Sequence, residues 1–221
     1  MIERNRNASA QEGVTKFDLV YTPSAPLPPR ELRALIAWRA VLWRLGLIGQ
    51  DPVRYGGVGF GNVSRRLPAR KEPDPRFAIS GTQTGALPAL DAGHFAIVTA
   101  CDMERNRVQA RGPIAPSSES LTHGMLYRLD SAIRFVFHVH APEIWRARRL
   151  LDLPATAGDI AYGTPAMAHE MERLARADAF SRRRLLVMAG HEDGVIAFGR
   201  TAEQAGVTLV RTLAEALASR A

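Results

Sequence analysis

The chain has 221 residues, 46% of them hydrophobic, which suffices for one globular domain with a sizeable core. No run of about 18 apolar residues occurs and the N-terminus is polar, so the sequence predicts neither a membrane span nor a secretory signal. The single cysteine, Cys101, excludes an intrachain disulfide framework and a cysteine-rich zinc knuckle, and we expect a cytoplasmic protein.

The formal net charge of +7 would suit a nucleic-acid partner, because clustered cations displace counterions from phosphates. The arginines are scattered, however, and the densest groups, within 146–149 and 182–184, contain no interleaved aromatic residues. Solvated faces and salt bridges between subunits explain this distribution better. We therefore expect no nucleic-acid partner.

In chain order, residues 1–29 are polar and end in TPSAPLPP, which predicts an irregular N-terminal arm ahead of one domain over 30–221. Residues 30–46 carry apolar side chains at helical spacing with a glycine near the end, which predicts an amphipathic helix. The glycine-rich stretch YGGVGFGNVSRRLP then predicts a tight turn that enters a strand.

The middle of the chain predicts short strands over 76–80, 94–100 and 107–112, with the loop GTQTG between the first two. Proline and serine residues then open a helix over 118–130. The clearest strand in the sequence follows, AIRFVFHVH at 132–140.

The C-terminal third predicts helices over 142–151, 165–179 and 201–219, the last with Thr201 as N-cap. Between them lie a short strand or turn over 158–164 and a pair of strands in RRLLVMAGH and GVIAFG. Because several strands are consecutive and no regular βαβ alternation occurs, we expect one mixed or largely antiparallel sheet that carries helices.

Two histidines, His138 and His140, end the strand predicted at 132–140. In a strand, side chains two apart point to the same face about 7 Å from each other, so both rings can reach one metal ion. Buried imidazoles need partners, and a bound cation supplies one to both rings. Catalytic zinc sites typically use three protein ligands and one open position, so this site requires a third ligand.

Four other histidines are candidates for that ligand. His94 begins a predicted strand, and His123 and His169 lie in predicted helices, where packing or surface positions also explain them. His191 follows the apolar strand LLVMAG and precedes EDG, which places it at a strand end next to a turn. We predict His191 as the third ligand, because a second strand end could lie beside the first in the sheet.

Residues 116–120, PSSES, open a predicted helix, and Glu119 in its first turn complements the helix dipole. The same geometry binds phosphate or carboxylate, because exposed N–H groups at a helix start donate hydrogen bonds to anions and Ser117 and Ser118 add hydroxyl donors. Glu119 near a cation would act as a base toward a metal-polarised substrate. The loops GFGNVS and SGTQTG are glycine-permitted turns that also offer N–H groups, and Asn62 offers its amide, to an anion.

The order of these motifs resembles the class II aldolase/adducin family: GNVS, a Ser/Thr/Gly loop, PSSE at a helix start, HVH at a strand end and a late His before GVIAFG. The resemblance covers about residues 30–219. It implies an α/β fold, a three-layer α/β/α sandwich on a mixed, mostly antiparallel sheet. It also implies a homo-oligomer, commonly a C4 homotetramer with active sites at subunit interfaces.

In the family's enzymes the HxH pair and a downstream histidine bind a divalent metal, usually Zn²⁺, which here implies His138, His140 and His191 as ligands. The resemblance also implies Glu119 as the catalytic acid/base residue. The positions that match the family's binding sites for a phosphate or equivalent anion are Gly61, Asn62, Thr84, Gly85, Ser117 and Ser118.

The sequence departs from the family pattern in three places. Two extra residues separate His191 from the glycine-led strand that follows. The loop SGTQTG is longer than in sugar-phosphate aldolases, so Ser80–Thr82 is an alternative to Thr84 and Gly85. The tyrosine that donates a proton in fuculose-phosphate-type aldolases has no clear counterpart, although Tyr162 matches an aromatic position further along and is expected at the substrate site.

Only two of the 29 basic residues, Lys16 and Lys71, are lysines, and both lie in polar or charged segments. A Schiff-base aldolase needs a desolvated lysine, so activation by a metal is favoured. We expect a metal-dependent aldolase-type lyase that acts on a small hydroxy-carbonyl substrate, phosphorylated or carboxylated, through a metal-stabilised enediolate. A dehydratase, decarboxylase or epimerase on the same scaffold and a non-catalytic, adducin-like interaction module are the alternatives.

Overall fold

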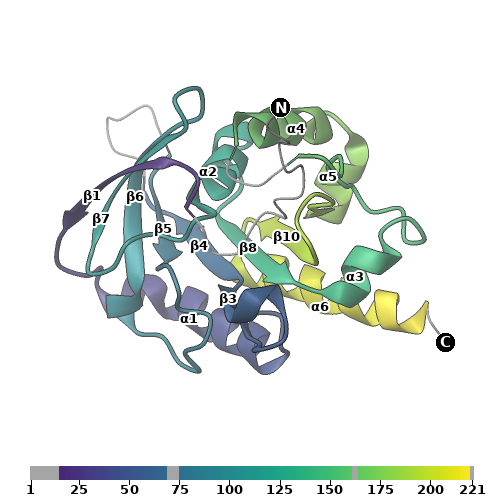
Figure 1. The fold of residues 1–221 in the computed structure, drawn as a ribbon, viewed down its shortest axis with the longest axis horizontal. Coiled ribbons are helices and arrows are strands. Elements are labelled where there is room, and N and C mark those ends of the chain that lie inside the picture. The colour runs from purple at the N-terminus through teal and green to yellow at the C-terminus, as the bar shows by residue number, and fades with distance from the viewer. Residues whose placement is uncertain (1–14, 69–74, 161–163, 220–221) are drawn as a thin grey trace, which may run out of the picture.

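The computed structural model describes residues 15–68, 75–160 and 164–219, which are built around one eight-stranded sheet (Figure 1). In spatial order its strands are β1 (Asp18–Pro23), β7 (Arg107–Gly112), β6 (Phe95–Asp102), β5 (Phe77–Ser80), β4 (Asn62–Arg66), β8 (Phe135–His140), β10 (Gly194–Gly199) and β9 (Leu185–Val187). Strands β1 and β7 pair in parallel, and the other neighbours pair antiparallel. The predicted mixed, mostly antiparallel sheet is thus confirmed.

Helices cover both faces of this sheet and make three layers (Figure 1). On one face lie α1 (Pro29–Arg44), α3 (Pro142–Ala147) and α6 (Ala202–Ala218), which share one buried apolar cluster with the sheet. On the other face lie α2 (Ser120–Leu129), α4 (Pro165–Ala175) and α5 (Asp178–Arg183), which share a second cluster. The predicted α/β/α sandwich is therefore confirmed.

Strand β8, which carries the HxH pair, is buried on both faces. Phe137 and Val139 belong to the cluster under α1, α3 and α6, whereas Val136 belongs to the opposite cluster. Because successive strand side chains alternate, His138 and His140 point with Val136 toward the layer that contains α2. A two-stranded sheet, β2 (Gly49–Gln50) with β3 (Gly59–Phe60), precedes β4.

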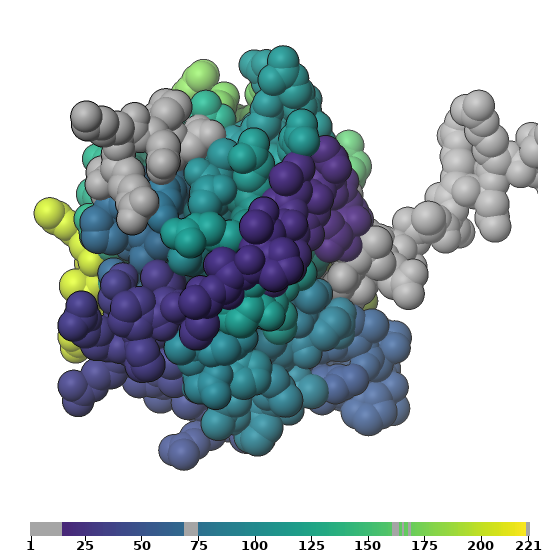
Figure 2. Space-filling model, turned by 90° about the vertical axis from the view of Figure 1, so that its left-hand side faces the viewer, coloured from purple at the N-terminus to yellow at the C-terminus, as the bar shows by residue number. Residues whose placement is uncertain are grey.

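The prediction of an irregular segment over 1–29 is wrong for Asp18–Pro23, which forms the edge strand β1. Figure 2 shows this purple N-terminal segment crossing one face of the molecule. The hydroxyl of Tyr21 donates to the Gly112 carbonyl (2.6 Å) and adds to the backbone pairing with β7. The burial of its residues alternates, and Leu19 and Tyr21 pack against the apolar cluster that α2 shares with the sheet, so apolar contacts support the pairing with β7.

Two helix boundaries also differ from the predictions. The helix predicted over 165–179 is divided into α4 and α5, because Ala177 takes an extended conformation (φ −88°, ψ 135°). The helix predicted over 142–151 ends at Ala147. No helix within the described ranges is long and apolar enough to cross a membrane.

Candidate metal centre and loop pocket

The pairing of β8 with β10 brings the HxH pair and the late histidine together. Gly194, the first residue of β10, lies opposite His140, so the turn that precedes β10 lies beside the end of β8. Hydrogen bonds from the N–H of His191 to the Met188 carbonyl (3.0 Å) and from the N–H of Gly194 to the His191 carbonyl (3.0 Å) close this turn. The turn therefore presents His191 to His138 and His140.

These three histidines, which we call the histidine triad, form a compact buried cluster. Their ring centroids are 4.8 to 5.1 Å apart, and one nitrogen from each ring lies within 4.8 Å of the other two. His138 and His140 are fully buried and His191 is 4% exposed. Three imidazoles with one open coordination position are a common donor set for catalytic zinc, so these residues fit a divalent ion.

The protonation state of the triad also suits a metal. Burial, followed by the neighbouring His191 ring, holds the pKa of His138 and that of His140 well below the usual 6.5. Both rings are therefore neutral at neutral pH. Neutral imidazole is the form that coordinates metal ions, so no proton has to be displaced from these two ligands.

The carboxylate of Glu119 lies against the triad. Its Oε1 is 3.4 Å from Nδ1 of His191, and both side chains are buried. Glu119 stands directly before the first residue of α2, and its N–H donates to Oγ of Ser117 (3.3 Å). The helix start thus fixes a carboxylate beside a candidate metal ligand.

The other three histidines do not belong to this group of candidate donors. His94 pairs with Asp91 (2.7 Å), and the exposed His169 lies 4.0 Å from Glu172. His123 is buried, and its Nδ1 is 2.6 Å from Oγ of Ser64 in a hydrogen-bonded network. Burial lowers the pKa of His123 to about 3, so its ring is neutral.

All six positions implied for anion binding line one small pocket, which we call the loop pocket. Its walls come from the β3–β4 turn, the loop after β5 and the residues before α2: Gly59, Gly61, Asn62, Gly81, Thr82, Gln83, Thr84, Gly85, Ser117 and Ser118. Thr82, one of the alternatives to Thr84 and Gly85, lines the same pocket. Ser80 instead accepts a hydrogen bond from the N–H of Val63 (3.1 Å).

Backbone hydrogen bonds join two walls of the loop pocket, the loop after β5 and the residues before α2. The N–H of Ser117 donates to the Ser80 carbonyl (3.2 Å), and the N–H of Thr82 donates to the Ala115 carbonyl (3.0 Å). Gly85 packs so tightly that a Cβ there would lie 2.4 Å from the Gly49 carbonyl oxygen. The pocket shape therefore requires glycine at this position.

Arg39 is a residue of this site that the sequence did not single out. It is 2% exposed, and its guanidinium donates to the carbonyls of Thr84 (2.8 Å), Gly85 (3.1 Å) and Leu87. Burial lowers the pKa of Arg39 to about 10, so it remains charged at neutral pH. The helical spacing of apolar residues on α1 does not by itself point to Arg39. The available signal was the position of this arginine on the buried face of an amphipathic helix.

Arg54, Tyr55 and Asp193 form a second feature that the sequence did not reveal. The Tyr55 hydroxyl donates to Oδ2 of Asp193 (2.6 Å), and the Tyr55 ring packs on His140 with centroids 4.4 Å apart. Burial, together with the Asp193 carboxylate, raises the pKa of Tyr55 above its usual 10. Asp193 is one of the two extra residues after His191, and this insertion was the sequence signal that could have pointed to the cluster.

Two residues named in the sequence analysis, Tyr162 and Lys71, lie outside the described residues.

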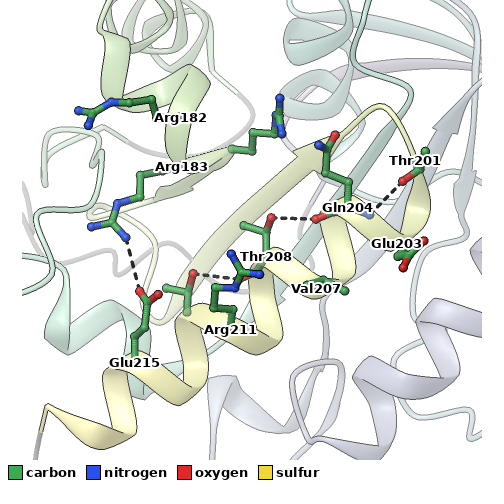
Figure 3. Close-up of a pocket in the computed structure, with 11 residues that line it drawn as sticks. Arg182, Arg183, Thr201, Glu203, Gln204, Val207, Thr208, Arg211 and Glu215 are labelled. Atoms are coloured by element: carbon green, nitrogen blue, oxygen red, sulfur yellow. Dashed lines mark hydrogen bonds and ion pairs between the residues drawn. The ribbon is translucent and has the colours of Figure 1, made fainter.

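A separate cavity of about 490 Å³ lies between α5 and α6 and is lined by four arginines and two glutamates (Figure 3). Nη1 of Arg183 lies 3.4 Å from Oε2 of Glu215. Figure 3 shows Arg183 turned toward Glu215, whereas Arg182 points away from α6. The triad residues do not line this cavity.

Comparison with solved structures shows where the same fold occurs. The fold is similar to that of L-fuculose-1-phosphate aldolase from Thermus thermophilus, with 20% identity, a TM-score of 0.60 and coverage of 87% of this chain and 95% of that one. A sugar-phosphate aldolase from Thermotoga maritima is 16% identical, with a TM-score of 0.65 and coverage of 86% and 93%. The N-terminal class II aldolase domain of a conserved protein from Thermoplasma acidophilum is 15% identical, with a TM-score of 0.60 and coverage of 90% and 97%.

A search of curated proteins finds no significant match. The family model described as Class II Aldolase and Adducin N-terminal domain, however, matches residues 54–218, which is most of the sequence. The chain therefore belongs to the class II aldolase and adducin N-terminal domain family.

Proposed function

We propose that this chain is a metal-dependent aldolase-type lyase whose substrate is a small hydroxy-carbonyl compound with a phosphate or carboxylate group. The class II aldolase domain identifies an aldolase-like enzyme. The observation that carries the proposal is the continuity of Ser117, Ser118 and Glu119: the two serines line the loop pocket, and the next residue contacts the histidine triad. One short segment thus joins a candidate anion site to a candidate metal centre.

His138, His140 and His191 would hold the metal, and three imidazole ligands with one open position are a common donor set for catalytic Zn²⁺. A divalent ion bound there supplies Lewis-acid polarisation of a substrate carbonyl oxygen. The burial of the triad keeps water away from the reacting atoms and strengthens electrostatic interactions inside the site.

Glu119 would act as the base. In a retro-aldol reaction it takes the proton of the hydroxyl on the carbon that leaves, the carbon–carbon bond breaks, and the electron pair moves to the carbonyl end of the substrate. The same carboxylic acid then returns a proton to the product. N–H groups of the loop pocket, with the hydroxyls of Ser117 and Ser118, would bind the anionic group and set the distance between it and Glu119.

Replacement of Glu119 by glutamine tests this assignment. Glu119→Gln keeps the size of the side chain but removes the base, so turnover should fall by at least about 100-fold while the metal content stays unchanged. Glu172→Gln, which changes an exposed glutamate on α4, is the matched control and should behave as wild type. A loss of metal in Glu119→Gln would show that Glu119 is a ligand and not the base.

The substrate would be sought among sugar phosphates, hydroxy acids and aromatic acids. Dehydration, decarboxylation and epimerisation would use the same site as aldol cleavage. Identification of the products would therefore decide which reaction the chain catalyses. A metal-loaded chain that turns over none of these compounds would favour a non-catalytic, adducin-like module.

We also propose that the chain forms a homotetramer and is located in the cytoplasm. The molecular mass in solution tests the first proposal, and cell fractionation tests the second.

A further inference from the structure

A cluster of three side chains lies beside the histidine triad and has no part in the proposed reaction. Arg54 donates to the Tyr55 hydroxyl, and its Nη2 lies 3.3 Å from Oδ2 of Asp193. The Tyr55 hydroxyl donates to the same carboxylate oxygen at 2.6 Å. Asp193 is 5% exposed, so its charge is stabilised by these two donors in a site that water barely reaches.

The aromatic ring of Tyr55 forms one wall of the triad. Its centroid lies 4.4 Å from that of His140, with the rings at 71° in an edge-to-face arrangement. Phe60 packs against both rings, at 5.1 Å from Tyr55 and 5.2 Å from His140. The orientation of the His140 ring is therefore limited by where the Tyr55 ring lies.

Asp193 is joined to both segments that carry the triad. It belongs to the turn that begins at His191, and its backbone carbonyl accepts from the N–H of Ala141 (2.8 Å), the residue after His140. Its carboxylate binds the tyrosine that packs on His140. One residue thus links the position of His191 to the orientation of His140.

The backbone at both partners is strained in the same sense. Tyr55 has φ +52° and Asp193 has φ +60°, in the left-handed region that an aromatic residue rarely adopts. Such a conformation persists only when surrounding contacts hold it. The hydrogen bond between the two side chains joins these two positions directly, and Arg54 contacts both side chains.

We propose that Tyr55 and Asp193 are positioning residues for the metal centre: their hydrogen bond sets the His140 ring relative to His191. The inference rests on the metal site of the proposed function. It also gives a role to Asp193, one of the two residues by which the segment after His191 is longer than the family's pattern. The Tyr55 hydroxyl donates its single proton to Asp193, which suits a residue that positions a metal ligand.

Metal affinity of the full chain tests this inference. Metal-free protein is titrated with Zn²⁺ in competition with a chelator, and Co²⁺ absorption reports the ligand geometry. Tyr55→Phe keeps the ring but removes the hydroxyl, and should weaken Zn²⁺ binding by about 10-fold or more and change the Co²⁺ spectrum. Tyr21→Phe is the matched control, because it removes a hydroxyl that also makes a 2.6 Å hydrogen bond, but on the edge strand β1.

A double-mutant cycle separates positioning from general loss of stability. Asp193→Ala should weaken Zn²⁺ binding at least as much as Tyr55→Phe, because it also removes the contact with Arg54. The double variant should lose about as much as Asp193→Ala alone, because the hydrogen bond between Tyr55 and Asp193 is already absent there. Asp193→Asn keeps an acceptor oxygen and tolerates a positive φ, so it should recover most of the affinity. Circular dichroism of the metal-free variants confirms that folded protein is compared.

The outcomes distinguish this inference from the proposed function. If Tyr55→Phe and Asp193→Ala bind Zn²⁺ with wild-type affinity and give the wild-type Co²⁺ spectrum, the positioning role is wrong and the metal centre stands. Equal weakening of Zn²⁺ binding in Tyr21→Phe would also overturn the positioning role, because the loss of affinity would then come from a general loss of stability. A wild-type chain that binds no divalent ion would overturn the metal centre, and this inference with it.

Discussion

The carboxylate of Glu119 lies 3.4 Å from the ring of His191, although the two residues come from the start of α2 and from the turn before β10. Both side chains are buried, so the contact is not a surface ion pair. It places a group able to take a proton next to a candidate metal ligand. The proposed reaction depends on this relationship.

Replacement of Gly85 by alanine should damage the loop pocket. An added Cβ would lie 2.4 Å from the Gly49 carbonyl oxygen and 2.9 Å from the Phe60 nitrogen, and backbone atoms cannot move aside cheaply. We expect destabilisation of about 1–3 kcal/mol and a weaker affinity for inorganic phosphate. Urea unfolding and calorimetric titration measure the two effects. Gly158→Ala, with no atom within 4 Å of the new Cβ, should change neither, and an unaffected Gly85→Ala would refute the packing argument.

Arg39→Met should loosen the same loop from the opposite side. The guanidinium donates to the carbonyls of Thr84, Gly85 and Leu87, and methionine removes all three hydrogen bonds, although the Thr84 carbonyl still accepts from the N–H of Leu87. We expect about 3 kcal/mol of lost stability and a higher KM for an anionic substrate, with a smaller change in kcat. Arg33→Met, at an exposed position on the same helix, is the control for denaturant unfolding and kinetics. Equal effects of the two replacements would contradict the role given to Arg39.

His123 should make the fold less stable in acid. Burial lowers the pKa of His123 to about 3 in the folded chain, against about 6.5 in the unfolded chain, so between these values only the unfolded state binds the proton. The free energy of unfolding contributed by this residue therefore falls as the pH drops below about 6.5. From pH 7 to pH 5 the loss should be about 2 kcal/mol.

Urea unfolding of metal-free wild type and of His123→Gln at both pH values measures this contribution. The variant should lose about 2 kcal/mol less than wild type between pH 7 and pH 5. His169→Gln, which replaces an exposed histidine, should keep the wild-type dependence. The same slope in all three proteins would show that His123 titrates normally in the fold.

Local sequence was sufficient for the features that depend on short-range rules. The two-residue period of β8 places His138 and His140 on one face, and the strand pair at the C-terminus brings His191 beside them. The motif order indicated the family and its three-layer fold, which the structure has. The metal-binding and anion-binding roles of these residues stay predictions.

Features that depend on contacts between distant segments could not be predicted from the sequence. Asp193 bonds to Tyr55 across the fold, and no local pattern connects the two residues. Arg39 is buried because loop carbonyls from another part of the chain surround its guanidinium. Strand β1 pairs in parallel with β7, a partner that the local sequence does not indicate. In each case the partner, and not the residue's own neighbours in sequence, decides the structure.

The metal content of the purified chain tests the central claim most directly. After saturation with Zn²⁺ and dialysis, we expect about one ion per wild-type chain and loss of that ion in His138→Ala, His140→Ala and His191→Ala. The exposed His169→Ala should retain it. A wild-type chain without bound metal, or triad variants that keep the ion, would contradict the account.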